Sequence, residues 1–237
     1  MLQSDNRIIM VSGANRGIGR AVAENLMSKG YTLSLGARNE AQLDSVTSDF
    51  DPNRFMTHTY DAANTDTGKA WVAATIDRFG RIDGLVNNAG MGGGVNLEDD
   101  NDEAFKEIFE VNTMAHLRMT RLTLPHLRAS GSGRIVNISS LSGKRVANDG
   151  TGYAMSKYAL MAVSHAARRA GWSDGVRVTA VCPGWVNTDL AANAGSMPRD
   201  EMIQSEDLAE LISTVIALPN NAHVAELLVS CSLGENY

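Results

Sequence analysis

The stretch Arg7-Ile-Ile-Met-Val-Ser-Gly-Ala-Asn-Arg-Gly-Ile-Gly19 decides the fold of this 237-residue chain. Its first six residues are a short apolar run typical of a strand, and the glycines at 13, 17 and 19 predict a tight turn into a helix. Backbone N–H groups at a helix start carry partial positive charge, and glycine lets an anion approach closely. The stretch therefore predicts a phosphate-binding turn, although a glycine loop by itself can be only a turn.

The same alternation of strand-like and helical patterns continues to the end of the chain. We expect strands at 7–12, 31–35, 54–60, 82–87, 133–139, 176–182 and 224–231, and helices at 17–29, 40–48, 65–79, 102–128, 152–171 and 205–217. This order favours a parallel sheet covered by helices on both faces. We predict an α/β, Rossmann-like, doubly wound fold with seven parallel strands. Residues 1–237 would form a single domain with a substrate loop at about 185–204.

Charge and hydropathy indicate which partners the protein has. The chain carries 21 basic and 27 acidic residues, a net charge of -6, and no basic cluster that would indicate nucleic acid or an anionic membrane. Its apolar runs are far shorter than the roughly 20 residues that span a bilayer, and its start lacks the pattern of a secretory signal. The five histidines show no metal-ligand spacing. We therefore expect a cytoplasmic protein with a small-molecule partner and no metal.

Tyr153 and Lys157 form the most informative pair of polar residues. A spacing of four places them on one face of a helix. A nearby positive charge favours the ionised form of a phenol, whose pKa is ordinarily about 10, and so makes it a usable acid or base. The alternative is a solvated surface pair.

Two arginines indicate which dinucleotide the glycine turn would bind. Arg38 follows the second strand, where an acidic residue would bind a ribose 2′-hydroxyl, and Arg16 stands at a helix start, where a cation is ordinarily disfavoured. A guanidinium pairs well with a 2′-phosphate. Both positions favour NADP(H), and NAD(H) remains possible because Glu40 is nearby. The alternative is that both arginines are merely solvated.

Several short motifs occur together in a fixed order. They are the three glycines, Asn87-Asn-Ala-Gly90, Ser140, Tyr153 with Lys157, and Pro183-Gly184. With them the chain resembles the short-chain dehydrogenase/reductase family from residue 7 to about 190. The resemblance implies an NADP(H)-dependent oxidoreductase that transfers hydride between nicotinamide and a carbonyl or secondary alcohol of a small molecule. It also implies a homodimer or homotetramer.

The resemblance implies a role for each catalytic position. Tyr153 would give a proton to the carbonyl oxygen, Ser140 would hold that oxygen, and Lys157 would lower the pKa of Tyr153 and bind the nicotinamide ribose. Ser139 would point to the other face, because side chains alternate along a strand. Asn112 lies on the buried stripe of the helix over 102–128, and a water leading to Lys157 would make it part of a proton relay. The alternative is an Asn that simply hydrogen-bonds in the core.

The resemblance extends to the cofactor and substrate sites. Asp61 would contact adenine, Asn88 to Gly90 the ribose, and Val186 and Thr188 the carboxamide. The full set of expected cofactor contacts adds Gly13, Asn15, Arg16, Gly17, Ile18, Gly19, Arg38, Ala62, Ala89, Tyr153, Lys157, Pro183 and Gly184. Expected substrate contacts are Met91, Ser142, Arg145, Trp185 and Met197.

Some alternatives stay open at this point. Lys144 and Arg145 would attract an anionic substrate or would be solvated. The alternatives to the reductase are a non-catalytic dinucleotide-binding sensor and an NAD-linked enzyme of the same family.

Overall fold

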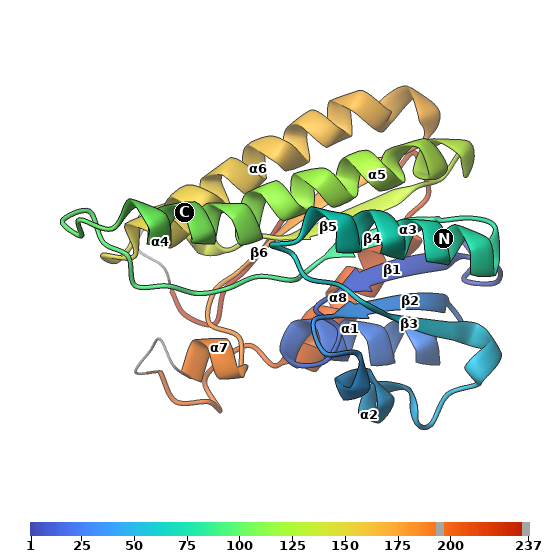
Figure 1. The fold of residues 1–237 in the computed structure, drawn as a ribbon, viewed down its shortest axis with the longest axis horizontal. Helices are drawn as coiled ribbons and strands as arrows, with labels where there is room; N and C mark the ends of the chain where they lie inside the picture. Colours follow the sequence, from blue (N-terminus) through green and yellow to red (C-terminus); the bar gives the residue numbers. More distant parts are fainter. Residues whose placement is uncertain (193–196, 234–237) are drawn as a thin grey trace.

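The computed structural model describes residues 1–192 and 197–233, and it consists of one parallel sheet with helices on both faces (Figure 1). The strand order is β3-β2-β1-β4-β5-β6-β7, and every neighbouring pair is parallel. The strands are β1 Ile8–Ser12, β2 Thr32–Ala37, β3 Phe55–Thr59, β4 Gly84–Asn87, β5 Arg134–Ile138, β6 Arg177–Pro183 and β7 Glu226–Val229. All seven correspond to predicted strands, which confirms the predicted fold.

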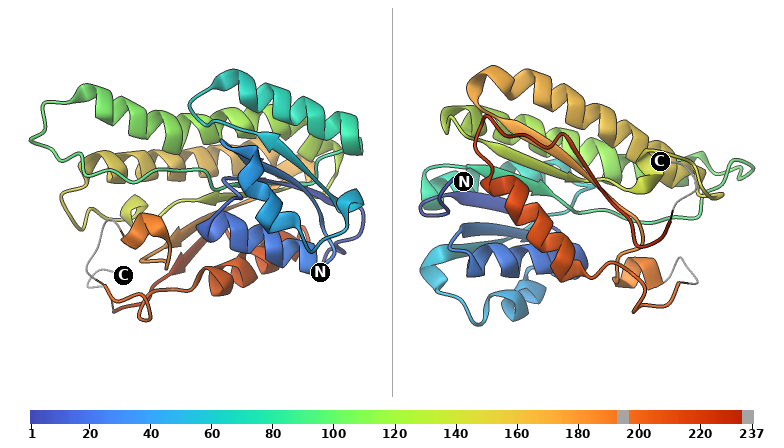
Figure 2. Two further views of the ribbon diagram at one scale, coloured as in Figure 1. Left: turned by 60° about the horizontal axis from the view of Figure 1, so that its bottom comes forward. Right: turned by 180° about the vertical axis from the view of Figure 1, so that it is seen from behind.

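Helices cover the two faces in separate groups (Figure 2). On one face α1 packs against α8 and α2, and on the other α5 packs against α3 and α6, with α4 beside α6. The helices are α1 Gly17–Ser28, α2 Asp44–Thr47, α3 Thr65–Phe79, α4 Asp102–Phe109, α5 Ala115–Ala129, α6 Thr151–Gly171, α7 Asp189–Ala192 and α8 Ser205–Ala217. No helix in these described parts is long and apolar enough to cross a membrane.

Two predicted helices differ from the structure. The continuous helix expected over 102–128 is interrupted by a π-helical segment, Glu110–Met114, between α4 and α5. Asn112 and Thr113 within it hydrogen-bond to Met91 and Ser156, outside the helix, and π-bulges of this kind are frequent at functional sites. The helix expected over 40–48 begins instead as a 3-10 turn, Glu40–Leu43, before the short α2.

Alternating side chains of β1 join the sheet to both helical layers. Ile9 and Val11 belong to the apolar cluster that includes Leu208 of α8, whereas Met10 packs with Trp71 of α3 on the other face. All of these side chains are fully buried. Burial of one large apolar side chain contributes roughly 1.5–3 kcal/mol, so the central strand is held firmly from both sides.

The sheet also fixes where a ligand can bind. The chain winds from β1 towards β3 on one side and from β4 towards β7 on the other, so β1 and β4 flank the point where the strand order reverses. Ligands of open α/β sheets bind in the crevice beyond the carboxyl ends of the strands at this point. Figure 1 shows α7 on this side of the sheet, beyond the strand ends.

Candidate active site

The glycine loop, residues 13–19, joins β1 to α1 at the reversal point. Gly13 and Gly17 have φ angles of +63° and +53°, which favour glycine. A Cβ on Gly19 would lie 2.2 Å from the Gly13 carbonyl oxygen, so the loop closes only with glycine there. α1 starts at Gly17 without a side-chain cap at Arg16. The uncapped N–H groups and the close backbone approach fit a pyrophosphate group.

The segment after β4 is fastened to this loop by Ser12. The Ser12 Oγ accepts hydrogen bonds from the backbone N–H groups of Asn88 at 2.9 Å and Ala89 at 3.0 Å. The Asn88 side chain donates to the carbonyl oxygens of Ser12 at 3.0 Å and Gly13 at 3.2 Å. Asn88 therefore acts on the glycine loop through its side chain, a role that the sequence did not indicate.

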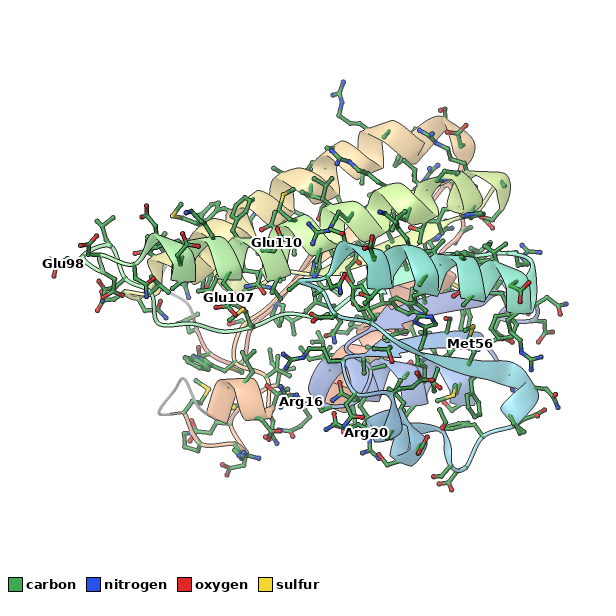
Figure 3. The ribbon with its side chains drawn as sticks, viewed as in Figure 1. Arg16, Arg20, Met56, Glu98, Glu107 and Glu110 are labelled. Atoms are coloured by element: carbon green, nitrogen blue, oxygen red, sulfur yellow. The ribbon has the colours of Figure 1, made fainter. Side chains whose placement is uncertain are left out.

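Arg16 and Arg38 are both exposed, one at the start of α1 and the other directly after β2 (Figure 3 labels Arg16). Glu40 does not share this position, because its carboxylate accepts hydrogen bonds from the hydroxyls of Thr57 at 2.7 Å and Thr59 at 3.2 Å. These contacts hold Glu40 against β3. The carboxylate of Glu40 therefore does not compete for the ribose. The two cations Arg16 and Arg38 fit a phosphate on the adenosine ribose.

Ser140 and Tyr153 come together at the carboxyl end of β5. The Ser140 hydroxyl is close enough to Tyr153 to lower the pKa of the phenol, and both residues are half-buried. Ser139 is buried on the other side, where its Oγ donates to the Lys157 carbonyl oxygen at 3.3 Å. The two half-buried hydroxyls are therefore placed to meet one oxygen of a small molecule.

Lys157 lies one helical turn after Tyr153 and is only 5% exposed. Its Nζ donates to the Ile138 carbonyl oxygen at 2.9 Å and lies 5.5 Å from the centre of the Tyr153 ring. Burial lowers the pKa of Lys157 to about 8. An ammonium group with one backbone partner has two further N–H groups to donate, which fits the hydroxyls of a ribose.

The pKa of Tyr153 differs in direction from the prediction. Burial raises it above the ordinary value, and the hydrogen bond from Ser140 lowers it only in part. Burial outweighs the favourable interactions of the phenolate, so in this structure Tyr153 holds its proton at neutral pH.

Asn112 holds the chain that follows Gly90. Its Oδ1 accepts from the Met91 N–H at 2.9 Å, and its Nδ2 donates to the Met91 carbonyl oxygen at 2.9 Å and to Ser156 Oγ at 3.1 Å. Both N–H groups of the amide are thus used. The Oδ1 atom can accept a second hydrogen bond, so these contacts are compatible with the expected water leading to Lys157.

His116 is a site residue that the sequence analysis missed. It is 1% exposed, and its Nε2 lies 2.8 Å from the Ala89 carbonyl oxygen. Burial, and then the charge of Lys157, lower its pKa to about 3. From the sequence we had concluded only that the histidines lack metal-ligand spacing. The sequence feature that could have identified His116 is its position four residues after Asn112, which places both side chains on one helical face.

The expected adenine contacts lie beyond β3. Asp61 is half-buried, and its Oδ1 accepts from the Ala63 N–H at 3.0 Å. Ala62 is buried, and its carbonyl oxygen accepts from Arg118 at 3.0 Å. Asn15, expected in the same cofactor site, instead joins the glycine loop to the next turn by donating to Gln42 at 2.7 Å.

The segment after β6 runs past the glycine loop. Pro183 ends β6, and the Gly184 N–H donates to Val229 at 2.8 Å. Val186 is buried and pairs with Ile203 in a parallel bridge. A Cβ added at Gly17 would lie 3.0 Å from Thr188 Cγ2, so these residues are in close contact with the glycine loop.

The expected substrate residues lie in three loops, and one of them, Ser142, contacts Ser140 directly. Ser142 donates its backbone N–H to Ser140 Oγ at 3.1 Å, and Met91 is held by Asn112. Trp185 and Met197 meet at Cys231, whose thiol lies 3.8 Å from the Trp185 carbonyl oxygen and 3.6 Å from the Met197 sulfur. Met91, Trp185 and Met197 are half-buried.

Two cations were considered as attractors of an anionic substrate. Lys144 is instead ion-paired with Glu226 at 2.6 Å, and Glu226 also contacts His165 at 2.8 Å. Arg145 is half-buried in the same loop. The Lys144 ion pair ties this loop to β7 and so removes the basis for that role of Lys144.

A doubly wound parallel sheet with a glycine loop and a Ser140, Tyr153 and Lys157 site defines a nucleotide-binding α/β protein with an acid/base centre. The short chain dehydrogenase family model matches residues 7–199, and the chain belongs to this family. Agropine synthesis reductase from Rhizobium rhizogenes is 46% identical over 94% of this chain and 52% of its own length. The chain thus spans about half the length of that relative.

Solved structures of similar shape cover nearly the whole chain. An actinorhodin polyketide ketoreductase variant, determined with NADPH, is 29% identical with a TM-score of 0.89, and the match covers 100% of both chains. An alcohol dehydrogenase from the archaeon Thermococcus sibiricus, complexed with 5-hydroxy-NADP, is 28% identical with a TM-score of 0.86. That match covers 94% of this chain and 95% of the other.

Proposed function

We propose that this chain is an NADP(H)-dependent oxidoreductase that transfers hydride between nicotinamide and a carbonyl or secondary alcohol of a small molecule. The observation that carries this proposal is that the hydroxyls of Tyr153 and Ser140 lie near each other beside the buried ammonium of Lys157. These groups stand at the carboxyl edge of a sheet whose glycine loop fits a pyrophosphate.

Tyr153 is the proposed proton donor to the carbonyl oxygen during reduction. Its pKa is raised, so the phenol carries its proton at neutral pH and is ready to act as an acid. Ser140 is proposed to donate its hydroxyl hydrogen to the same oxygen, which fixes the carbonyl at hydrogen-bonding distance from Tyr153.

Lys157 is proposed to serve both the proton transfer and the cofactor site. Its charge stabilises the phenolate that Tyr153 becomes when it gives up the proton. Its two further N–H groups are available for the ribose hydroxyls. NADP(H), when bound, supplies the hydride or accepts it. We propose Asn112 as a positioning residue, because it holds Met91 next to this site.

The preference for NADP(H) rests on Arg16 and Arg38. Arg16 is exposed at the start of α1 and Arg38 is exposed directly after β2, where the ribose 2′-phosphate would lie, and Glu40 is held by β3. The similar structures determined with NADPH and 5-hydroxy-NADP support this choice. An NAD-linked enzyme is the alternative, and equal binding of NADH and NADPH by the wild type would favour it.

The proposed substrate is a small ketone, aldehyde or sugar-like compound held by Met91, Ser142, Arg145, Trp185 and Met197. The names of the similar proteins support a reduction: one is a reductase of agropine synthesis and another a polyketide ketoreductase. We further propose a cytoplasmic homodimer or homotetramer. Light scattering during size-exclusion chromatography would measure its mass.

Loss of NADPH absorbance with a panel of carbonyl compounds tests the proposed activity. Tyr153→Phe should lower turnover about 10²- to 10⁴-fold, the usual contribution of a general acid, with NADPH affinity changed less than about threefold. Tyr158→Phe is the matched control, because Tyr158 is an exposed tyrosine of the same helix. NADPH binding without any Tyr153-dependent turnover would favour a non-catalytic sensor.

A further inference from the structure

Two side chains of one helical face hold three backbone atoms of the segment Ala89–Met91. Asn112 binds both the N–H and the carbonyl oxygen of Met91, and His116, four residues later, binds the carbonyl oxygen of Ala89. A spacing of four puts neighbouring side chains on the same face of a helix. Gly90 is therefore held on both sides by contacts from the start of α5 and the π-helical segment before it.

Gly90 is the part of this segment that lies next to the proposed catalytic centre. It is exposed, and a Cβ added there would lie 3.2 Å from Asn112 Oδ1 and 3.9 Å from Lys157 Nζ. Any shift of Ala89 or Met91 would thus move the backbone of Gly90 relative to the Lys157 ammonium. The same segment is joined to the glycine loop through Ser12.

The chemistry of His116 suits it to this position. A carbonyl oxygen can only accept, so the Nε2 of His116 must carry the proton that is shared with Ala89. Burial and the charge of Lys157 keep the pKa of His116 low, at about 3, and the ring neutral. A neutral imidazole gives a directed N–H donor in a buried place without adding a second positive charge beside Lys157.

We infer that His116 is a positioning residue, which together with Asn112 fixes Ala89–Met91 against the Lys157 ammonium and the proposed cofactor site. The influence of His116 on catalysis rests on the proposed function. Its hydrogen bond to the backbone of Ala89 does not depend on that function, because it is present in the protein without cofactor.

Three variants test the inference. His116→Phe keeps a ring and removes the donor, whereas His116→Gln can place an amide N–H where Nε2 lies. Thr123→Val is the matched control for lost polarity in the buried face of α5, because the Thr123 hydroxyl bonds only within the helix, to the carbonyl oxygens of Met119 and Thr120. His116→Asn replaces His116→Phe if the larger apolar ring prevents folding.

Amide hydrogen exchange of Met91, measured by NMR in the cofactor-free protein, is the first readout. His116→Phe should speed exchange at Met91 at least about tenfold, while His116→Gln and Thr123→Val stay within about threefold of the wild type. Unchanged exchange in His116→Phe, or exchange in His116→Gln as fast as in His116→Phe, would overturn the inference.

Kinetics are the second readout. We expect His116→Phe to lower kcat/KM about tenfold or more, with His116→Gln restoring most of it and Thr123→Val leaving it unchanged. A kcat/KM for His116→Phe equal to that of Thr123→Val would overturn the catalytic part of the inference. A wild type that neither binds NADPH nor turns over a carbonyl would refute the proposed function, and Met91 exchange would still decide the role of His116.

Discussion

The Nζ of Lys157 lies 5.5 Å from the centre of the Tyr153 ring and is held there by the Ile138 carbonyl oxygen at 2.9 Å. The two side chains thus share one face of α6, and strand β5 supplies the hydrogen bond that fixes the lysine. Burying the positive charge of Lys157 costs free energy of folding. The same burial lowers the pKa of Lys157.

This cost gives the first prediction. The pKa of Lys157 is about 8 in the folded protein and 10.5 in the reference state, so between these values the unfolded chain binds more protons. The free energy of unfolding should therefore rise with pH across this window, and the full cost is present below about pH 8. Lys157→Met should stabilise the protein at neutral pH by about 1–3 kcal/mol while abolishing activity.

Urea unfolding of the wild type and Lys157→Met, at neutral pH and near pH 10, measures this effect. The stability gained by the variant should shrink at the higher pH. Lys69→Met is the control, because Lys69 is an exposed lysine in a surface pair with Asp66. A stability difference that is the same at both pH values would contradict a buried charge at Lys157.

The second prediction concerns cofactor choice. Arg38→Ala should weaken NADPH binding about 10- to 100-fold and change NADH binding less than about threefold, since a guanidinium pairs with a phosphate that NADH lacks. Fluorescence titration with both cofactors measures it. Lys69→Ala, which removes a positive charge from an exposed surface pair with Asp66, should leave both affinities unchanged. An equal loss for both cofactors would argue against a 2′-phosphate contact at Arg38.

A third prediction follows from the contact between Gly17 and Thr188. Gly17→Ala should weaken NADPH binding at least about tenfold, because the new methyl group would meet Thr188 Cγ2 at 3.0 Å and the φ of +53° is unfavourable for alanine. Thr188→Ser removes that methyl group and keeps the hydroxyl. Adding Thr188→Ser to Gly17→Ala should therefore restore part of the affinity. Additive losses in the double variant would show that the two residues do not meet.

The fourth prediction concerns the ion pairs of Glu226. Glu226→Gln weakens the contacts that tie Lys144 and the loop after β5 to β7, so we expect a raised KM for the carbonyl substrate with kcat changed less than about twofold. The free energy of unfolding should change by less than about 1 kcal/mol, because these groups are partly exposed. Glu103→Gln, at a surface pair with Lys106, is the control. A lower kcat with unchanged KM would contradict this.

Local patterns were sufficient to predict the sheet. Each predicted run became a strand, and the central strands β1, β4, β5 and β6 are buried along their whole length, as expected for a parallel sheet covered on both faces. The glycine spacing predicted the tight turn at Gly13 and the helix start at Gly17 for the same local reason. Ser140 lies near Tyr153 because β5 ends beside α6. The order of the motifs along the chain was enough to predict that the two residues come together.

The remaining differences arise from contacts between distant parts of the chain. Asn112 and Thr113 of the π-helical segment bond to Met91 and Ser156, and no helical periodicity encodes such distant partners. The role of His116 depends on the Ala89 carbonyl oxygen, 27 residues away. The raised pKa of Tyr153 depends on how deeply the fold buries the phenol. The spacing of Tyr153 from Lys157 in the sequence predicts only that the lysine charge would lower this pKa.

The bridge between Val186 and Ile203 brings together the two ends of the proposed substrate loop, with hydrogen bonds of 3.0 Å from Ile203 to Trp185 and 2.9 Å from Asn187 to Ile203. Because both ends are anchored at one place beside the sheet, insertions, deletions or exchanges between them need not disturb β6 or α8. Selectivity for different compounds can therefore diverge in evolution, or be engineered by grafting, while the proton-transfer machinery is inherited unchanged.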